Sequence, residues 1–416
     1  MKKSITFFFP YHDVSGVPVL FLNLAEFICS HFKYDVYIID YKDGYMANNL
    51  NKTSNVKLIQ FEKGKLLHIS ETVLVMQAIL PYAMRPELII SGNTKVFFWC
   101  LFPDIFFPFV FPFNFIKKNI RKNTKLYQLI LNFFYKKTLK KIKEFVIEMN
   151  NHKALIFMDS SNLNRTNEIL GLKLYTDTYL PISCEGDNQI INKNVPKKNE
   201  LNISWLGRVC DFKVYILKYT IEKLAELAKN KNKYIVFHLI GNGNEISVIE
   251  NISVNNEYFT LNIVGVIPKN QLDQYLTDNI DINTAMGTSA LESARLGIPT
   301  IVLDISYHEI VSDYIFRWLH NTSNYDVGHN ITSLDFEDNN MSLEIIIEDF
   351  ELEKETLKDK SYEYFQNNHS TESVSNKLIQ FIELYSFKFD NINNFYFKKS
   401  ILRKIYEYKQ YKIWSK

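Results

Sequence analysis

The stretch GTSALESARLGIPTIV, residues 287–302, decides how the second half of this chain folds. It predicts a turn at Gly287, then a short helix and a buried strand. The backbone N–H groups of Thr288 and Ser289 at the start of such a helix have no partner within the helix, so they can bind an anion. We therefore expect a phosphate-bearing ligand at this turn, with the carboxylate of Glu292 nearby.

A second motif lies upstream, where the strand-like run 203–206 is followed by Gly207, Arg208 and then Lys213. Arginine can bind a phosphate through two parallel hydrogen bonds, and lysine binds it as a point charge. Taken alone, either cation is more often a solvated surface charge. The glycine at the strand end, and the place of Lys213 at the start of the next predicted helix, favour a diphosphate clamp.

Apolar runs of strand length alternate with helical patterns in both halves of the chain, which indicates parallel sheets with crossover helices. The polar segment 185–200 interrupts this alternation and is typical of a linker. A chain of 416 residues is long enough for two cores. The predicted fold class is α/β, with two Rossmann-like domains facing a cleft, over residues 1–190 and 200–370, and a basic helical tail over residues 371–416.

Ligands bind at the carboxyl ends of the strands in such sheets. Glycines follow several predicted strands at this edge and would let a ligand approach the backbone closely. In the first domain the loop after the first strand carries His12 and Gly16, and Asp159 follows a later strand. A histidine or an aspartate in a loop is more often a bystander than a catalyst, so these positions are secondary candidates.

The order of Arg208, Lys213 and the 287–302 stretch resembles the C-terminal domain of the GT-B glycosyltransferases, in particular glycosyltransferase family 4. The resemblance implies that the two cations hold the diphosphate of a nucleotide-sugar donor and that Glu292 accepts hydrogen bonds from the ribose. The family pattern is Glu-x7-Glu, and Thr284 stands here in place of the first glutamate. That departure leaves the sugar contact, and a retaining or inverting outcome, open.

The resemblance also implies roles for neighbouring positions. Residues expected to take part in catalysis are Arg208, Lys213, Glu292 and His12. Residues expected to contact the donor are Gly16, Gly207, Gly241, Gly243, Gly265, Val266, Thr284, Gly287, Thr288 and Ser289.

Glu292 also has a structural interpretation. Ser289-x-x-Glu292 is the pattern of a capping box, in which the serine and the glutamate satisfy each other's backbone donors. Both roles can hold if the carboxylate keeps free lone pairs.

Several functional classes find no support in the sequence. It contains no Asp-x-Asp triplet and no evident metal-ligand spacing, so we expect no metal and no cofactor besides the donor substrate. The phosphate loop of P-loop nucleotidases and the Gly-x-Ser-x-Gly elbow of serine hydrolases are absent. A net charge of +2 does not indicate nucleic-acid binding, and four widely spaced cysteines fit a reducing compartment.

Residues 97–143 combine a run rich in Phe and Pro with a basic helical pattern, and residues 398–416 repeat the basic and aromatic character. Between Lys117 and Lys143 there are ten Lys or Arg and no Asp or Glu. The prolines argue against a spanning helix. The pattern is typical of attachment to an anionic membrane surface, and the alternative is a core-packed helix with a solvated charged face.

These expectations combine into one functional hypothesis, a hexosyltransferase that needs no metal. Its acceptor would be a bacterial surface polysaccharide, such as lipopolysaccharide or capsule, or a lipid-linked oligosaccharide. It would work in the cytoplasm, peripherally on the inner face of the cytoplasmic membrane. Two alternatives stay open, a GT-B-fold nucleotide-sugar 2-epimerase and a non-catalytic member that binds a glycan or nucleotide, because fold alone does not separate them.

Overall fold

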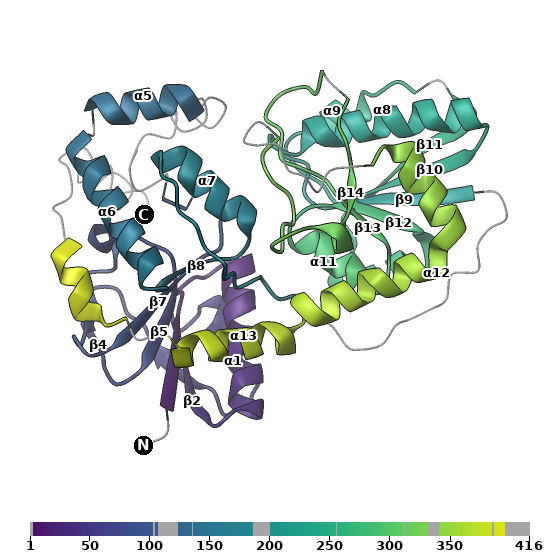
Figure 1. The fold of residues 1–416 in the computed structure, drawn as a ribbon. Coiled ribbons are helices and arrows are strands. Elements are labelled where there is room, and N and C mark those ends of the chain that lie inside the picture. The colour runs from purple at the N-terminus through teal and green to yellow at the C-terminus, as the bar shows by residue number, and fades with distance from the viewer. Residues whose placement is uncertain are drawn as a thin grey trace. The chain divides into compact units, whose positions relative to one another are not determined.

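The computed structural model describes residues 3–102, 105–106, 124–134, 136–185, 200–254, 256–311, 313–331, 341–384 and 387–395. The chain divides into two compact units (Figure 1). Unit 1 comprises Met1–Ser183 and Thr371–Lys416, and unit 2 comprises Cys184–Ser370. The sequence predicted a break at 190–200 and another at 370. After the second break the chain returns to unit 1.

Unit 1 is built on a parallel six-stranded sheet with the order β3-β2-β1-β5-β7-β8, and two further short strands, β4 and β6, pair with each other. Alternate residues of β1, such as Ile5 and Phe7, are fully buried in one core with α1 and α13. These two helices lie side by side (Figure 1). The strands are β1 (Lys3–Phe8), β2 (Tyr34–Asp40), β3 (Lys57–Gln60), β4 (Leu67–Ile69), β5 (Val73–Gln77), β6 (Leu88–Ile90), β7 (Lys95–Cys100) and β8 (Leu155–Phe157).

The helices of unit 1 connect these strands and cover the sheet. They are α1 (Gly16–His31), α2 (Tyr45–Asn49), η1 (Pro81–Ala83), α5 (Thr124–Phe134), α6 (Lys136–Asn151), α7 (Ser160–Leu170), α13 (Thr371–Leu384) and η3 (Phe389–Phe395).

Strand β7 corrects part of the membrane prediction. Phe97, Phe98 and Trp99 were assigned to a membrane-facing segment, yet they form a central strand and are at most 3% exposed. The indole N–H of Trp99 donates to the carbonyl oxygen of Leu180 at 2.9 Å. Aromatic residues suit a strand that is buried on both faces, and a parallel sheet requires such strands. Within the described part of the chain, every helix is too short or too polar to span a bilayer.

Unit 2 is built on a second six-stranded sheet with the order β11-β10-β9-β12-β13-β14, in which only β14 runs antiparallel to its neighbour. The strands are β9 (Glu200–Leu206), β10 (Tyr234–Ile240), β11 (Phe259–Gly265), β12 (Ile282–Ala285), β13 (Thr300–Val302) and β14 (Arg317–Trp318). The helices are α8 (Val214–Lys231), α9 (Ile246–Glu250), α10 (Lys269–Asn279), α11 (Thr288–Ala294), η2 (Leu319–Asn321) and α12 (Leu343–Asn368).

Neighbouring residues of β9 face opposite sides of this sheet, as expected for a strand. Trp205 belongs to the core that includes α8 and part of α12, and Leu206 belongs to a smaller core that includes Leu276 of α10. Residues of α8 are buried at helical spacing, for example Leu217, Ile221 and Leu224. Both faces of the sheet are therefore covered, and its strand ends are left to form a site.

In both sheets the first three strands follow one another in one direction, and the next strand of the sheet pairs on the other side of the first. This reversal creates a topological switch point beside the first strand. In unit 2 this point lies between β9 and β12. Doubly wound sheets bind ligands outside the carboxyl ends of the strands at such a point. The loop after β9 carries Gly207, Arg208 and Lys213, and the turn after β12 contains Gly287. The topology thus brings the two motifs that were found in the sequence to the same edge of one sheet.

Candidate functional site

Backbone hydrogen bonds join the loops that follow β9, β10 and β11. The N–H of Gly207 donates to the carbonyl of Ile240 at 3.0 Å, and the N–H of Gly241 donates to the carbonyl of Gly265 at 2.7 Å. The N–H of Val209 also donates to the carbonyl of Asn242 at 3.0 Å. The edge of the sheet is therefore held by fixed backbone contacts between neighbouring loops.

Two of the predicted donor-binding glycines serve this loop packing. A Cβ atom at Gly241 would overlap the carbonyl oxygen of Gly207, and one at Gly243 would overlap the carbonyl oxygen of Val209. Gly241 also has a φ of +137°, a conformation that favours glycine. These two glycines were predicted to make room for a ligand. On the side where a Cβ would point, the space is instead filled by the backbone of the loop after β9.

Gly265 and Val266 lie at the end of β11. The φ of Gly265 is +80°, and the direction in which a Cβ would point is open. The side chain of Val266 is 73% exposed. Both positions are accessible, so their predicted contact with the donor stays a prediction.

Lys213 is a cation in a largely apolar setting. Its Nζ lies 5.5 Å from the centre of the Trp205 ring and 5.8 Å from the centre of the Phe212 ring. Burial lowers the pKa of Lys213, and the positive charge of Arg208 lowers that pKa further. Arg208 itself is exposed. The two cations therefore influence each other electrostatically, as a shared anion site requires.

The loop of Lys213 and the start of α11 meet beside Gly207, whose φ is +148°. A Cβ atom at Gly207 would lie 3.6 Å from Nζ of Lys213 and 3.6 Å from Oγ of Ser289. Gly287 precedes α11 with a φ of +65°, and its N–H donates to the carbonyl of Val327 at 2.8 Å. The structure thus gathers Gly207, Lys213 and Ser289 around one point.

Helix α11 corrects the interpretation of Glu292 as part of a capping box. The N-cap is Gly287, which has no side chain, and Ser289 lies inside the first turn. Serine and glutamate are three residues apart, but they do not stand at the N-cap and N3 positions that a capping box requires. Glu292 instead accepts a hydrogen bond from Nε of Arg295 at 2.9 Å, and Arg295 also pairs with Asp273. The predicted ribose contact of Glu292 stays a prediction.

Thr284 does not occupy an accessible position. It lies in β12, its side chain is fully buried, and its hydroxyl donates to the carbonyl oxygen of Ser204 at 2.8 Å. A threonine in the middle of a parallel sheet is shielded by the neighbouring strands. This placement argues against the prediction that Thr284 contacts the donor.

In unit 1, His12 and Gly16 follow β1, and Asp159 follows β8. His12 is exposed, stacks on Tyr41 with ring centres 4.3 Å apart, and lies 3.4 Å from a carboxylate oxygen of Asp43. Gly16 is the first residue of α1 and is exposed. Asp159 is the N-cap of α7, and its carboxylate accepts a hydrogen bond from the N–H of Asn162 at 2.7 Å. This capping role accounts for an aspartate at this position without a catalytic function.

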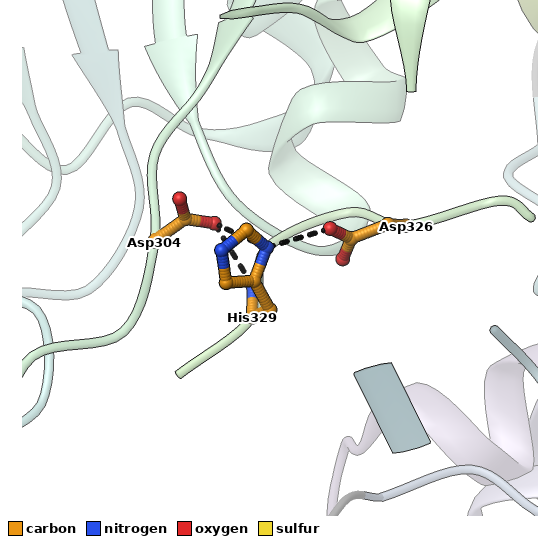
Figure 2. A group of neighbouring side chains, drawn as sticks. All are labelled: Asp304, Asp326 and His329. Atoms are coloured by element: carbon orange, nitrogen blue, oxygen red, sulfur yellow. Dashed lines mark hydrogen bonds and ion pairs between the residues drawn. The ribbon is translucent and has the colours of Figure 1, made fainter. Parts of the chain in front are cut away.

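Sequence reasoning missed a buried charged cluster close to α11. The guanidinium of Arg317 donates to both carboxylate oxygens of Asp304, at 2.8 and 2.9 Å, and to Asp326 at 2.8 Å. Nδ1 of His329 lies 2.8 Å from Asp326 (Figure 2). The sequence offered one signal, the arginine inside the apolar run Ile315–Leu319. A charged residue in such a run indicates a buried charge, and a buried charge requires a partner.

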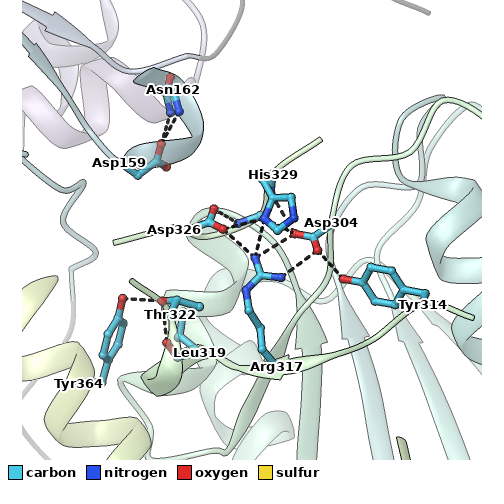
Figure 3. Close-up of polar contacts among 11 residues, drawn as sticks. Asp159, Asn162, Asp304, Tyr314, Arg317, Leu319, Thr322, Asp326, His329 and Tyr364 are labelled. Carbon is cyan, nitrogen blue, oxygen red and sulfur yellow. Dashed lines mark hydrogen bonds and ion pairs between the residues drawn. The ribbon is translucent and has the colours of Figure 1, made fainter. Parts of the chain in front are cut away.

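The ligand types in this cluster, two carboxylates and an imidazole, could hold a metal ion. The guanidinium of Arg317, however, already lies against both carboxylates (Figure 3). Burial alone would raise the pKa of Asp304, but Arg317 and His329 hold that pKa below its usual range. A cation of the protein itself therefore already lies between the two carboxylates, and the geometry favours an ion-pair network over a metal site.

The basic face predicted between residues 97 and 143 lies partly on α5 and α6. Ile142 of α6 is buried, and four lysines of α6 are exposed: Lys136, Lys137, Lys140 and Lys141. On α5 the exposed residues include apolar ones, since Leu129 is 68% and Phe133 is 81% exposed. Residues 107–123 and 396–416, which include the basic and aromatic segment 398–416, lie outside the described residues.

No protein-family model and no curated protein sequence matches the chain. Among solved structures, a glycosyltransferase from Rickettsia africae ESF-5 is similar with a TM-score of 0.54 and 13% identity, over 92% of this chain and 98% of that chain. HepE from Anabaena in complex with UDP and glucose has a TM-score of 0.49 and 10% identity, over 92% of this chain and all of that chain. WaaG, a glycosyltransferase involved in lipopolysaccharide biosynthesis, has a TM-score of 0.47 and 12% identity, over 91% of this chain and 99% of that chain.

The predicted GT-B fold is confirmed by the two six-stranded sheets and by the first of these similarities. At this level of identity the similarity concerns the fold, and the assignment to glycosyltransferase family 4 stays a prediction.

Proposed function

We propose that this GT-B protein transfers a hexose-type sugar from a nucleotide-sugar donor to an acceptor glycan. The observation that carries the proposal is the setting of Lys213. Its ammonium group lies near two aromatic rings and beside Gly207 and Ser289, and among the described residues no carboxylate forms an ion pair with it. Lys213 is partly buried, and its removal from water disfavours the charged form unless a counter-charge lies nearby. An anionic ligand at the switch point would supply that charge.

A nucleoside diphosphate fits this position for two reasons. Lys213 and Arg208 would neutralise the charge that develops on the departing diphosphate, which is the main electrostatic task in this type of transfer. The neighbouring Glu292 lies on the same face of α11 as Ser289, because the two are three residues apart. Its carboxylate would then orient the ribose. Helix α11 has only seven residues, so the side chains supply most of the proposed binding.

The proposed reaction uses no metal ion, since Arg208 and Lys213 would take its electrostatic role. Two other functions are compatible with the same donor site. A nucleotide-sugar 2-epimerase would need catalytic acids close to the sugar, and a non-catalytic member would bind the nucleotide without turnover. The aromatic setting of Lys213 and the glycines around it favour donor binding in all three cases. The products of the reaction distinguish the three functions.

We further propose that the acceptor is a surface polysaccharide or a lipid-linked oligosaccharide and that the protein works on the inner face of the cytoplasmic membrane. Support comes from α5 and α6. The exposed Leu129 and Phe133 lie on α5, and the adjacent α6 exposes lysines at its start. Exposed apolar residues beside cations suit an anionic lipid surface.

The donor proposal is tested with a panel of UDP-, GDP-, ADP- and dTDP-sugars, scored for binding, hydrolysis, transfer and epimerisation. Lys213→Ala and Arg208→Ala should each weaken nucleotide binding by about 10- to 100-fold, the range for hydrogen bonds to charged groups. Lys229→Ala is the matched control, since it removes an exposed cation from the far end of α8. Wild-type protein that binds no nucleotide sugar, or Lys213→Ala protein that binds as well as the wild type, would refute the proposal.

A further inference from the structure

The buried cluster around Arg317 is connected by hydrogen bonds to both halves of the candidate donor site. The cluster consists of Asp304, which follows β13, Arg317 at the start of β14, and Asp326 and His329 in the segment after η2 (Figure 3). Arg317, Asp304 and Asp326 are fully buried, and His329 is 4% exposed. Such groups in a low-dielectric interior hold one another in a single geometry.

The first connection leads from Asp304 to the loop of Lys213. Asp304 is held by the two guanidinium hydrogen bonds of Arg317 and by the hydroxyl of Tyr314, which donates to it at 2.6 Å. Two residues further on, the N–H of Ser306 donates to the carbonyl of Phe212 at 3.0 Å. Phe212 directly precedes Lys213 and contributes one of the rings beside its ammonium group.

The second connection leads from Asp326 to α11. Asp326 accepts from Arg317 at 2.8 Å and from the N–H of Gly328 at 2.9 Å, which holds the intervening residue in place. The carbonyl of that residue, Val327, accepts the N–H of Gly287 at 2.8 Å. Gly287 is the N-cap of α11 and sets where Ser289 and Glu292 lie.

We propose that Arg317 is a positioning residue of the donor site, which sets the loop of Lys213 and the start of α11 relative to each other through Asp304 and Asp326. This inference rests on the proposed nucleotide-sugar donor. Arg317 is fully buried, so its proposed role is to position other residues and not to contact the donor. It acts because one planar guanidinium donates to two carboxylates at fixed angles, a geometry that lysine does not reproduce.

The two connections make separable predictions. Tyr314→Phe loosens the Asp304 side and should weaken binding of inorganic pyrophosphate, which needs Lys213. Asp326→Asn loosens the α11 side and should weaken binding of the nucleoside part, measured with a nucleoside monophosphate, which needs Glu292. Arg317→Met should weaken both and lower turnover by about 100-fold, since small displacements in a site have effects of this size. Arg317→Lys should restore less than half of the lost affinity.

A matched control separates positioning from stability. Lys354 and Asp281 form another largely buried ion pair in unit 2, with a distance of 2.8 Å. Asp281 precedes β12, so this pair lies at the amino ends of the strands, away from the site. Lys354→Met should lower the unfolding temperature while nucleotide affinity stays at the wild-type value. If Arg317→Met fails to fold, the milder Tyr314→Phe and Asp326→Asn decide the question.

The outcomes distinguish this inference from the proposed function. Wild-type protein that binds no nucleotide overturns the proposed function and with it the role of Arg317. Wild-type protein that binds and turns over the donor, while folded Tyr314→Phe and Asp326→Asn variants keep wild-type affinity for both probes, overturns the positioning role alone. Equal losses for both probes in the Lys354→Met control also overturn it, because they would show that any loss of stability in unit 2 disturbs the site.

Discussion

The ammonium group of Lys213 and the hydroxyl of Ser289 lie beside the same point, each 3.6 Å from where a Cβ atom would stand on Gly207. The two residues are 76 positions apart in the sequence, and they meet because β9 and β12 are neighbours at the switch point. A glycine between them leaves room for a third group. This local arrangement leads to the first prediction.

Gly207→Ala should abolish nucleotide binding at a moderate cost in stability. The new methyl group would have ordinary contact distances, but it would occupy the space between Lys213 and Ser289. The φ of +148° adds strain of about 1–3 kcal/mol. Gly64→Ala in unit 1 is the control, because it has a φ of +81° and open space around it. Thermal unfolding and calorimetric titration with UDP should show similar destabilisation in both variants and lost binding in only one.

The second prediction concerns pH and Lys213. Burial lowers the pKa of this ammonium group below 10.5 in the free protein. A bound diphosphate favours the charged form, so binding should raise that pKa again and take up protons in alkaline solution. Nucleotide affinity should therefore be full at neutral pH and fall with rising pH, with a midpoint below 10.5. Titrations in buffers of different ionisation enthalpy would measure the proton uptake, and a pH-independent affinity up to pH 10 would contradict the assignment.

Glu292 and Asp273 offer a matched pair for the third prediction, because both carboxylates bind Arg295. Glu292→Gln and Asp273→Asn each remove one charge from this cluster without changing the size of the side chain. Only the first should reduce turnover, by about 10-fold or more, and weaken nucleoside binding, since only Glu292 is proposed to contact the ribose. Steady-state kinetics and binding to UMP are the measurements. Equal effects of the two variants would indicate a structural role for the cluster.

Much of unit 2 could be predicted from periodicity and glycine positions. The short helix predicted after Gly287 appears at Thr288–Ala294. Strand β9, which contains the predicted run 203–206, and strand β13 both pair with β12. The helix and the strands follow from local patterns in short segments of the sequence. The place of the site follows from the rule that ligands bind at the carboxyl ends of the strands. That is why Gly207 and Lys213 could be placed at the same edge as Gly287.

Features that depend on contacts between distant segments could not be predicted. The glycines 241 and 243 seemed suited to a ligand, but the space next to them is filled by the loop after β9. Arg317 in the two-residue strand β14 pairs with Asp304, 13 positions before it, and with Asp326, 9 positions after it. Both aspartates lie in irregular backbone, where the sequence shows no periodic pattern. Thr284 appeared at a motif position, and only the strand pairing of β12 shows that its hydroxyl is used inside the sheet.

The exposed residues of α5 give a fourth prediction, on membrane binding. The protein should float with vesicles that contain phosphatidylglycerol and much less with vesicles of phosphatidylcholine, and binding should weaken with salt. Leu129→Asp should reduce binding by about 10-fold, because burial of a leucine contributes about 1.5–3 kcal/mol. Leu352→Asp is the control, since Leu352 is 83% exposed on α12 in unit 2. Equal flotation of the two variants would show that α5 does not contact the lipid.

The last prediction concerns stability in acid and His320. Burial lowers the pKa of this histidine from 6.5 to about 4, and the positive charge of Lys360 acts in the same direction. The ring stacks against Trp318 with centres 6.1 Å apart. Because the folded-state pKa lies below the unfolded value, the unfolded chain binds more protons between pH 4 and 6.5. The contribution of His320 is therefore complete above pH 6.5 and lost as the pH falls to 4.

His320→Phe keeps an aromatic ring beside Trp318 and removes the titrating group. At pH 7 the variant should be about as stable as the wild type. At pH 4 it should be more stable by about 3 kcal/mol, since each unit of pKa shift corresponds to 1.36 kcal/mol. Urea unfolding at several pH values measures the difference, with a substitution at the exposed His68 as the control. A constant difference between pH 7 and pH 4 would mean that His320 keeps its ordinary pKa in the folded protein, and the burial argument for this residue would fail.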